Sequence, residues 1–467
     1  MSNELFDQGW VSATIGDYLY LKNGYAFKSK DYVEASNQSV PIIRISDLNG
    51  NIASDDNAAH VLNGIDGFEV HQNDLLIAMS GATTGKVGIY RGKEPAYQNQ
   101  RVGNIKLHSE EYGNTNYRNY LISALSKQIL DIAYGGAQPN ISGKAIEAIE
   151  IVLPSLAEQK IIAEKLDTLL AQVEATKARL ESALETLKQF RQSVLAAAVS
   201  GKLTEDLRSP KDKYTEFAGY MVPSSWLESS IGKECEYVTS GSRGWAKYYS
   251  ESGSLFIRSQ DINSDELKIQ DAAYVRLPEK VEGQRTKVQI DDLLITITGA
   301  NVTKCARIKC NLEDAYISQH VALVRLKSSG EAAFFELVLK AQNAGRKKLQ
   351  AMAYGGGKPG LNLQNIKDVE FAKPTTSEEV DTIIRRVENL LAGADTTEQQ
   401  VNQALKRVNN LTQSILAKAF RGELTEQWRK ENPDLISGEN SAEALLKKIK
   451  AERAAAKPKR KAGKARA

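Results

Sequence analysis

Two long stretches of the chain place apolar residues at alternating intervals of four and three. The first runs from about residue 155 to residue 200, and the second repeats the same register 221 residues further on. This spacing is typical of a coiled-coil seam, with charged and amide residues between the seam positions. A helix of about 45 residues is nearly 70 Å long at ~1.5 Å per residue, more than a compact domain can cover. We therefore expect two rods that pair with each other, antiparallel.

The predicted seam consists of equivalent positions in the two stretches. Its members are Ile162, Leu166, Leu169, Val173, Leu180, Leu187, Phe190, Val194, Ile383, Val387, Leu390, Val401, Val408, Leu411 and Ile415. Thr176 and Thr397 are polar seam positions at matching places. The two stretches also end alike, with Gly-Lys-Leu-Thr-Glu at residues 201–205 and Gly-Glu-Leu-Thr-Glu at residues 422–426.

A domain of short β-rich runs and Gly/Asn/Asp turns precedes each rod. The order of motifs in the first domain returns in the second. Trp10 is matched by Trp226, and Asp-Leu-Leu-Ile occurs at residues 74–77 and at residues 292–295. The chain is therefore a tandem duplication of domain plus rod, with widely different sequences between the shared motifs.

These patterns predict an α+β protein with two mixed α/β domains in pseudo-twofold tandem repeat and two long antiparallel coiled-coil helices. The predicted boundaries are 1–153 for the first domain, 154–208 for the central helix region, 209–373 for the second domain, 374–427 for the distal helix region and 428–467 for a C-terminal helix and basic tail. Residues 209–225 are expected to form a polar linker. The tail has two readings, a contact with nucleic acid or a partner and plain solubility.

Composition narrows the class of protein further. The chain has 467 residues, a net charge of +3 and three cysteines that fit neither a disulfide framework nor a zinc site. The four histidines form no ligand pattern, so no metal is expected. A signal peptide and an 18-residue apolar run are both missing, which predicts a cytoplasmic protein without a membrane span.

Two sequences resemble phosphate-binding loops but depart from them. Residues 81–86 have three residues between the glycines where a Walker loop has four, and Val87 follows the lysine in place of Ser or Thr. Residues 355–360 satisfy G-x-G-x-x-G, but Pro359 lies where a helix should begin. The Asp/Asn-Pro-Pro-aromatic motif of amino-methyltransferases does not occur either. We expect no active site and no cofactor bound by this chain.

Polar loop residues at matching places in the two domains are the candidate DNA-binding residues. In the first domain they are Arg44, Ser80, Thr83, Thr84, Lys86, Gln98, Asn99, Gln100, Arg101, Gln138 and Asn140. In the second they are Arg258, Gln260, Asn301, Thr303, Lys304, Gln319, His320 and Lys358. Arg, Gln and Asn read base edges bidentately, while Lys, Ser and Thr hold phosphates. Each residue alone is more often an ordinary turn residue, but the paired placement favours the group.

A family resemblance supports the DNA-binding interpretation. Residues 154–170 (PSLAEQKIIAEKLDTLL) closely resemble the central region of the specificity subunit of type I restriction-modification enzymes. The stretch from Arg386 to Lys450 resembles the distal region of the enteric type IA family. The sequence departs from the pattern at residues 374–379 (PTTSEE), where the first half has PSLAEQ.

The resemblance implies a non-catalytic subunit with two target-recognition domains that read a bipartite, asymmetric double-stranded DNA target with a fixed spacer. Its implied partners are two modification subunits, which bind S-adenosylmethionine and methylate adenine, and two restriction subunits, which use ATP and Mg for translocation and cleavage. The residues leave two alternatives open. One is a coiled-coil scaffold that holds proteins, and the other is a nucleotide-hydrolysing enzyme, which the broken loops disfavour.

Overall fold

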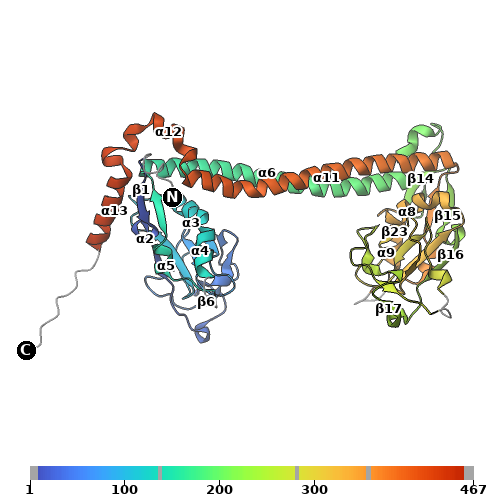
Figure 1. The fold of residues 1–467 in the computed structure, drawn as a ribbon, viewed down its shortest axis with the longest axis horizontal. Helices are drawn as coiled ribbons and strands as arrows, with labels where there is room; N and C mark the ends of the chain where they lie inside the picture. The colour runs from blue at the N-terminus through green and yellow to red at the C-terminus, as the bar shows by residue number, and fades with distance from the viewer. Residues whose placement is uncertain (1–8, 135–138, 279–282, 354–358, 457–467) are drawn as a thin grey trace, which may run out of the picture. The chain divides into compact units, whose positions relative to one another are not determined.

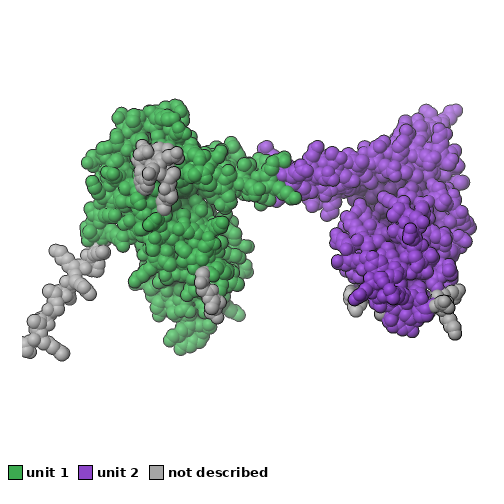
Figure 2. All heavy atoms as spheres, in the orientation of Figure 1, with its two compact units in different colours: residues 1–178, 405–467 green, residues 179–404 purple. Residues whose placement is uncertain are grey.

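The computed structural model describes residues 9–134, 139–278, 283–353 and 359–456 (Figure 1). The chain divides into two compact units (Figure 2). Unit 1 contains Met1–Ala178 and Leu405–Ala467, and unit 2 contains Arg179–Ala404. Each unit combines one mixed domain with one end of each of two long helices.

Unit 1 contains a six-stranded sheet in the order β2-β11-β8-β9-β5-β4 and a four-stranded sheet in the order β6-β3-β10-β7. A separate antiparallel pair, β1 and β12, joins the two ends of the domain. The strands are β1 (Val11–Thr14), β2 (Leu19–Asn23), β3 (Val40–Ile43), β4 (Leu48–Asn49), β5 (Ile52–Ala53), β6 (Ala59–Val61), β7 (Glu69–Val70), β8 (Leu75–Ala78), β9 (Val87–Tyr90), β10 (Ala96–Gln98), β11 (Val102–Leu107) and β12 (Glu150–Leu153). The shorter helices are α2 (Ile15–Tyr18), η1 (Ser29–Asp31), η2 (Ile45–Asp47), α3 (Thr115–Ala124), α4 (Ser126–Ala133), α5 (Gly143–Glu147), η8 (Glu423–Thr425), α12 (Glu426–Glu431), η9 (Pro433–Leu435), η10 (Gly438–Asn440) and α13 (Ala442–Ala456).

Unit 2 repeats the arrangement with a sheet in the order β16-β25-β22-β23, a second in the order β17-β21-β18-β24, and the antiparallel pair β15 and β26. Its strands are β13 (Tyr214–Phe217), β14 (Tyr220–Pro223), β15 (Leu227–Ser230), β16 (Cys235–Ser240), β17 (Tyr249–Ser250), β18 (Ser254–Ile257), β19 (Ile262–Asn263), β20 (Glu266–Leu267), β21 (Tyr274–Val275), β22 (Leu293–Thr296), β23 (Cys305–Arg307), β24 (Ala315–Ile317), β25 (Val321–Leu326) and β26 (Glu370–Lys373). Its shorter helices are η3 (Lys202–Leu207), α7 (Ile231–Glu234), η4 (Trp245–Tyr248), η5 (Ser259–Asp261), η6 (Gln284–Thr286), η7 (Ser329–Glu331), α8 (Ala332–Lys340), α9 (Gly345–Met352) and α10 (Leu363–Lys367).

The central strand of each domain is buried on both faces, which explains its continuous apolar run. In β8, Leu75 and Ile77 pack into one core cluster, while Leu76 and Ala78 pack into another. Strand β22 does the same in unit 2, because Leu293 and Leu294 belong to different clusters. The shared Asp-Leu-Leu-Ile motif therefore marks the strand that joins two cores.

The predicted linker after Arg208 is an error that the structure corrects. Strands β13 and β14 form a hairpin there, and Tyr220 and Val222 are buried in the core of unit 2. The strands of this hairpin alternate polar and apolar residues, which is the pattern of a half-buried strand. The prolines and charged residues around them made this pattern hard to recognise in the sequence.

The two long helices are α6 (Leu156–Val199) and α11 (Ser377–Phe420), 44 residues each. In unit 1 the start of α6 packs with the end of α11, since Ile162 and Leu416 share one core cluster. In unit 2 the end of α6 packs with the start of α11, since Val194 and Ile383 share another. The helices are therefore antiparallel in each unit, as the sequence predicted, and Figure 1 shows them side by side.

Most residues of the predicted heptad seam are buried or partly buried, but three of them are exposed. Phe190, Leu390 and Leu411 are 38%, 37% and 44% exposed, and Thr176 and Thr397 are also exposed. The face that is wholly or partly buried follows α11 through residues 380, 383, 387, 391, 394, 398, 401, 405, 408, 412, 416 and 419. This face shares positions 383, 387, 394, 401 and 408 with the predicted seam and differs from it by one residue at the positions between them.

Candidate nucleic-acid interface

Three loops of the first domain meet at the end of strand β8. The Met79 N–H donates to the Arg101 carbonyl at 2.9 Å, and the Ile141 N–H donates to the Met79 carbonyl at 2.9 Å. Ser80 and Asn140 form an isolated β-bridge. The segments 79–86, 99–101 and 139–141 thus form one surface, although they are far apart in sequence.

Two further segments join this surface through the same loop after β10. The Asn99 N–H donates to the Ile43 carbonyl at 3.0 Å, and the Tyr25 N–H donates to the Gln98 carbonyl at 3.0 Å. Gly24 is required here, because a Cβ at this position would lie 1.9 Å from the Asn99 carbonyl oxygen. We call these five segments the first-domain polar loops: 24–27, 43–47, 79–86, 98–101 and 139–141.

The second domain repeats this backbone network. The Ile297 N–H donates to the His320 carbonyl at 2.9 Å, and the Leu361 N–H donates to the Ile297 carbonyl at 2.8 Å. The Ser318 N–H donates to the Ile257 carbonyl at 2.8 Å. We call segments 257–261, 297–304, 318–320 and 359–361 the second-domain polar loops. Equivalent backbone hydrogen bonds therefore hold equivalent loops together in the two domains.

Several predicted DNA-binding residues are buried or use their polar groups to bond to the loops themselves. Gln98 is fully buried, and its Nε2 donates to the Lys22 carbonyl at 2.8 Å. The Thr84 Oγ1 donates to the Gly81 carbonyl at 2.6 Å. Asn301 Nδ2 lies 3.2 Å from the carbonyl oxygens of two residues of the neighbouring loop, and Thr303 is 3% exposed. These side chains hold the loops in shape.

Arg44 and Arg258 also bond to groups of their own loops. Arg44 Nε donates to Asp47 Oδ2 at 3.2 Å, and its second guanidinium nitrogen donates to the Asn57 carbonyl at 3.1 Å. Arg258 bonds Asp261 in the same way at 3.1 Å. In both domains the aspartate also accepts from the backbone N–H of the arginine, which closes a short 3-10 turn. The sequence could not distinguish these arginines from base-reading ones.

The remaining candidates lie on the surface of the polar loops. Lys86, Gln100, Arg101, Asn140, Gln260, Gln319 and His320 are exposed, while Ser80, Thr83, Asn99 and Lys304 are partly buried. Gln138 and Lys358 lie outside the described residues. Lys304 is partly neutralised, because its Nζ lies 3.7 Å from Asp265 Oδ2. Lys86 has no such partner among the described residues.

Side chains at equivalent positions of the two surfaces are partly alike and partly different. Gln100 and Gln319 both follow a residue whose N–H donates to the last residue of the neighbouring parallel strand, β3 in the first domain and β18 in the second. The next position is Arg101 in the first domain and His320 in the second. His320 Nδ1 lies 2.5 Å from the Thr298 hydroxyl. Two unlike sets of hydrogen-bonding groups on one frame can recognise two unlike sequences.

Sequence reasoning missed a buried junction between the first domain and the long helices. The Trp10 Nε1–H donates to Glu158 Oε2 at 3.0 Å. The Thr425 hydroxyl donates to Glu158 Oε1 at 2.6 Å, and Arg429 forms a charge-assisted hydrogen bond with the same oxygen at 2.5 Å. This junction therefore joins the domain to the start of α6 and to the segment after α11.

Unit 2 contains the same junction with the same residue types. The Trp226 Nε1–H donates to Glu379 Oε1 at 3.3 Å, Thr204 donates to it at 2.8 Å, and Arg208 lies 2.7 Å from it. The available signal was a repeated Gly-x-x-Thr-x-x-x-Arg motif, which begins at Gly201 and again at Gly422.

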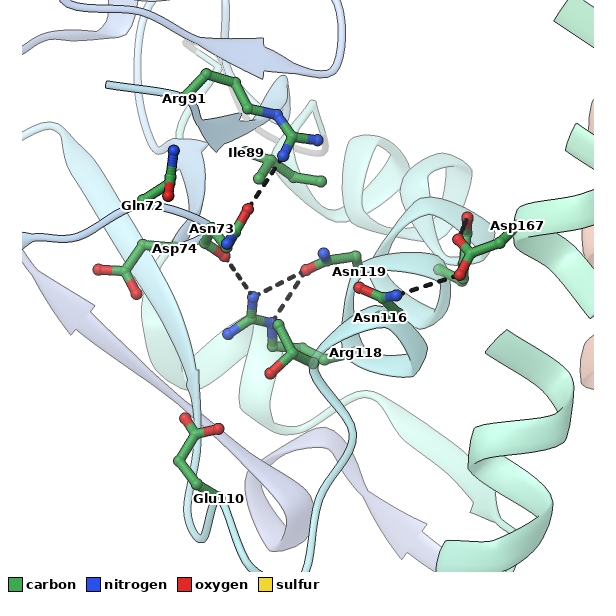
Figure 3. Close-up of a pocket in the computed structure, with 12 residues that line it drawn as sticks. Gln72, Asn73, Asp74, Ile89, Arg91, Glu110, Asn116, Arg118, Asn119 and Asp167 are labelled. Atoms are coloured by element: carbon green, nitrogen blue, oxygen red, sulfur yellow. Dashed lines mark hydrogen bonds between the residues drawn. The ribbon is translucent and has the colours of Figure 1, made fainter. Parts of the chain in front are cut away.

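A polar cavity of about 550 Å³ lies between the first domain and α6 (Figure 3). Arg118, 3% exposed, donates to the Asn73 carbonyl and to Asn119 Oδ1, both at 2.9 Å. The Asn116 Nδ2 donates to Asp167 Oδ2 of α6 at 3.2 Å. The labelled polar groups mostly satisfy one another, which is the arrangement of a domain–helix contact. In the described part of the chain no group of three or more His, Cys, Asp or Glu residues could hold a metal ion.

The sequence of the chain matches a known family. Residues 7–186 match the family described as the type I restriction modification DNA specificity domain. The chain is 38% identical to the EcoBI type I restriction enzyme specificity subunit of Escherichia coli, over 96% of this chain and 93% of that protein. It is 36% identical to the StySPI specificity subunit of Salmonella potsdam, over 97% of each chain.

Solved structures agree on the fold. The HsdS subunit of Thermoanaerobacter tengcongensis aligns with a TM-score of 0.55 at 16% identity, over 89% of this chain and 97% of that one. A chain from a study of type I restriction-modification complex assembly and conformational transition aligns with a TM-score of 0.67 at 15% identity, over 89% and 98%. The protein belongs to the family of type I restriction-modification specificity subunits, whose role is to select DNA and not to catalyse. Among the described helices none is long and apolar enough to cross a membrane.

Proposed function

We propose that the chain reads a bipartite, asymmetric double-stranded DNA target, one half-site with each set of polar loops. The observation that carries this proposal is that the two domains contain the same network of backbone hydrogen bonds but expose different side chains on the loops that it holds. Arg101 and Asn140 of the first domain stand where the second has His320 and Gly360. Equivalent frames approach DNA in the same way, while different donors and acceptors select different bases.

The proposal includes the assembly in which the target is used. Two modification subunits would bind S-adenosylmethionine and methylate adenine, and two restriction subunits would use ATP and Mg. The chain would position these subunits in the cytoplasm. The paired junctions at Glu158 and Glu379 support two similar binding sites for the modification subunits, one in each unit, because the helix ends are similar in both units.

An exchange of the first domain tests the proposal. Residues 11–153 would be replaced by the same region of the EcoBI subunit, since β1 and β12 close the domain at its two ends. We expect the complex with the modification subunit to change one half of its methylated motif and to keep the other. A change in both halves or in neither would contradict the assignment of one half-site to each domain.

Filter binding separates this function from a protein scaffold. The complex with the modification subunit is expected to retain chromosomal fragments that contain the target in preference to random DNA. A scaffold that binds only proteins would retain neither.

A further inference from the structure

Gln319 and His320 occupy the two central positions of a tight turn in the second-domain polar loops. The Val321 N–H donates to the Ser318 carbonyl at 3.0 Å, which closes the turn. The Ile297 N–H donates to the His320 carbonyl at 2.9 Å and holds the turn against the loop after β22. The backbone of the turn is therefore fixed on both sides, while the side chains of Gln319 and His320 are exposed.

The imidazole of His320 lies between two polar side chains and bonds to both. Its Nε2 lies 3.1 Å from Gln319 Nε2, and its Nδ1 lies 2.5 Å from the Thr298 hydroxyl oxygen. An amide nitrogen only donates, so His320 Nε2 is the acceptor of the first hydrogen bond. A neutral imidazole then carries its proton on Nδ1, which donates to Thr298 Oγ1. One tautomer of His320 therefore satisfies both contacts.

This arrangement leaves the Gln319 amide with one free donor and one free acceptor. His320 uses one N–H of the amide, while the second N–H and Oε1 have no partner among the described residues. A rotation that exchanged the nitrogen and the oxygen would break the hydrogen bond to His320. The amide is therefore fixed in direction. Adenine presents the complementary pair in the major groove, an acceptor at N7 and a donor at N6.

The first domain has the same turn without this contact. The Val102 N–H donates to the Asn99 carbonyl at 2.9 Å, and Gln100 and Arg101 lie between them. An arginine side chain has only donors, so Arg101 cannot accept a hydrogen bond from the Gln100 amide. The contact that fixes the direction of the glutamine is thus a property of the second domain.

We infer that His320, held by Thr298, is a positioning residue that fixes the Gln319 amide for recognition of one adenine in the second half-site. Gln319 Nε2 donates to N7 of this adenine, and Gln319 Oε1 accepts from N6. The inference rests on the proposed function, which places the second half-site at the second-domain polar loops. Each half-site then contains at least one adenine, because each of the two modification subunits methylates an adenine.

The first test removes the N7 acceptor from the DNA. The complex of the chain with the modification subunit is titrated with duplexes in which 7-deazaadenine, which has a carbon in place of N7, replaces each adenine of the methylated motif in turn. We expect one replacement in the second half-site to weaken binding about tenfold, within the discrimination of a bidentate base contact. Gln319→Ala should bind this duplex and the unmodified duplex equally. An effect that persists in Gln319→Ala, or a loss only with 7-deazaguanine, would overturn the inference.

Thr298 separates the positioning of Gln319 from a general role in the fold. Thr298→Val removes the hydroxyl but keeps the branched shape, so it should reduce the effect of 7-deazaadenine to less than threefold. Thr298→Ser is the matched control, because its hydroxyl can still accept from His320 Nδ1, and it should keep the tenfold effect. Thermal unfolding should give the same melting temperature for both variants. Equal binding behaviour of the two variants would overturn the role of this contact.

A double substitution tests whether His320 acts through Gln319. His320→Phe should weaken the preference for the adenine in the chain that has Gln319 and leave it unchanged in Gln319→Ala. A further loss in Gln319→Ala would show that His320 contacts the DNA independently, which rejects the inference. If the proposed function fails, the unsubstituted chain will show no preference for any motif, a result that differs from each of these outcomes.

Discussion

At the scale of single residues, the main finding is that exposure and hydrogen bonding separate candidates that sequence alone treats as equal. Gln98 and Gln100 are two residues apart, yet Gln98 is buried against the Lys22 carbonyl and Gln100 is exposed. Arg44 is bound to Asp47, while Arg101 is exposed. Residue type and spacing predicted which loops form the site, but the direction of each side chain depends on long-range contacts that a single sequence does not reveal.

Lys86 is expected to contact a phosphate. Lys86→Ala should weaken binding to all DNA sequences equally and reduce the salt slope by ~0.9, the change expected when one phosphate is no longer neutralised. The matched control is Lys93→Ala. Lys93 is also exposed but lies after the end of β9, whereas Lys86 lies just before its start, so this substitution should leave the salt slope unchanged. Titration of the complex with DNA at several salt concentrations measures both. Equal effects of the two substitutions would show that Lys86 is not a specific contact.

Gln100 and Gln319 are expected to read bases in different half-sites. Gln100→Ala should relax preference within the first half-site by ~1–3 kcal/mol and leave the second unchanged. Gln319→Ala should do the reverse. Competition binding with a duplex library that varies one half-site at a time provides the measurement. A uniform loss of affinity for all sequences would contradict base reading.

At the scale of elements, the heptad pattern predicted both long helices, their antiparallel pairing and most of the residues that are buried on them. Predicted seam positions and buried positions coincide at Ile162 and Ile383, where the helices also pack on the domains. They separate at Leu411, where the neighbouring Thr412 is the partly buried one. The pattern specifies an apolar stripe, but helix twist and domain contacts decide which part of the stripe is covered.

Two leucines of α11 test this difference. Leu416 is 3% exposed and Leu411 is 44% exposed. Leu416→Ala should lower the free energy of unfolding by about 2–4 kcal/mol, because it leaves a cavity in the core of unit 1. Leu411→Ala should change it by less than ~0.5 kcal/mol. Urea unfolding of the full chain measures both, and similar losses would mean that the heptad seam is the true contact.

Both junctions are expected to stabilise the fold. Glu158 is 1% exposed and accepts from Trp10, Thr425 and Arg429, so Glu158→Ala should lower the free energy of unfolding by about 3–5 kcal/mol. Glu379→Ala should act in the same direction, because Trp226, Thr204 and Arg208 face this carboxylate in unit 2. Thermal unfolding of the two variants measures both losses, and an unchanged melting temperature for either variant would contradict the role of its junction.

At the scale of the whole molecule, the duplication was visible in the sequence as repeated motifs. The junctions were not, because their members lie far apart in the chain, from Trp10 to Arg429 in unit 1 and from Thr204 to Glu379 in unit 2. The repeated junction extends the duplication to buried contacts. Thr204 and Arg208 after α6 match Thr425 and Arg429 after α11. The segment after α6 therefore carries the same hydrogen-bonding groups that face Glu158 after α11.

This equivalence predicts that a fragment ending at Arg208 forms a twofold dimer. Two copies of α6 would pair antiparallel, and each Glu158 would receive Thr204 and Arg208 of the other copy. The corresponding fragment of the second half should dimerise less well, because Gly393 lowers the helix propensity of α11 by ~1 kcal/mol relative to alanine. Sedimentation at micromolar concentration measures the association. A monomeric first-half fragment would refute the equivalence of the helix ends.

The most direct measurement for the central claim is the methylation pattern produced by the chain with its modification subunit. Single-molecule sequencing of DNA modified by this complex reports every methylated adenine together with its surrounding sequence. The account predicts one motif with two unlike specific parts separated by a fixed number of unspecified base pairs. A continuous motif, or two identical parts, would contradict the assignment of one half-site to each set of polar loops.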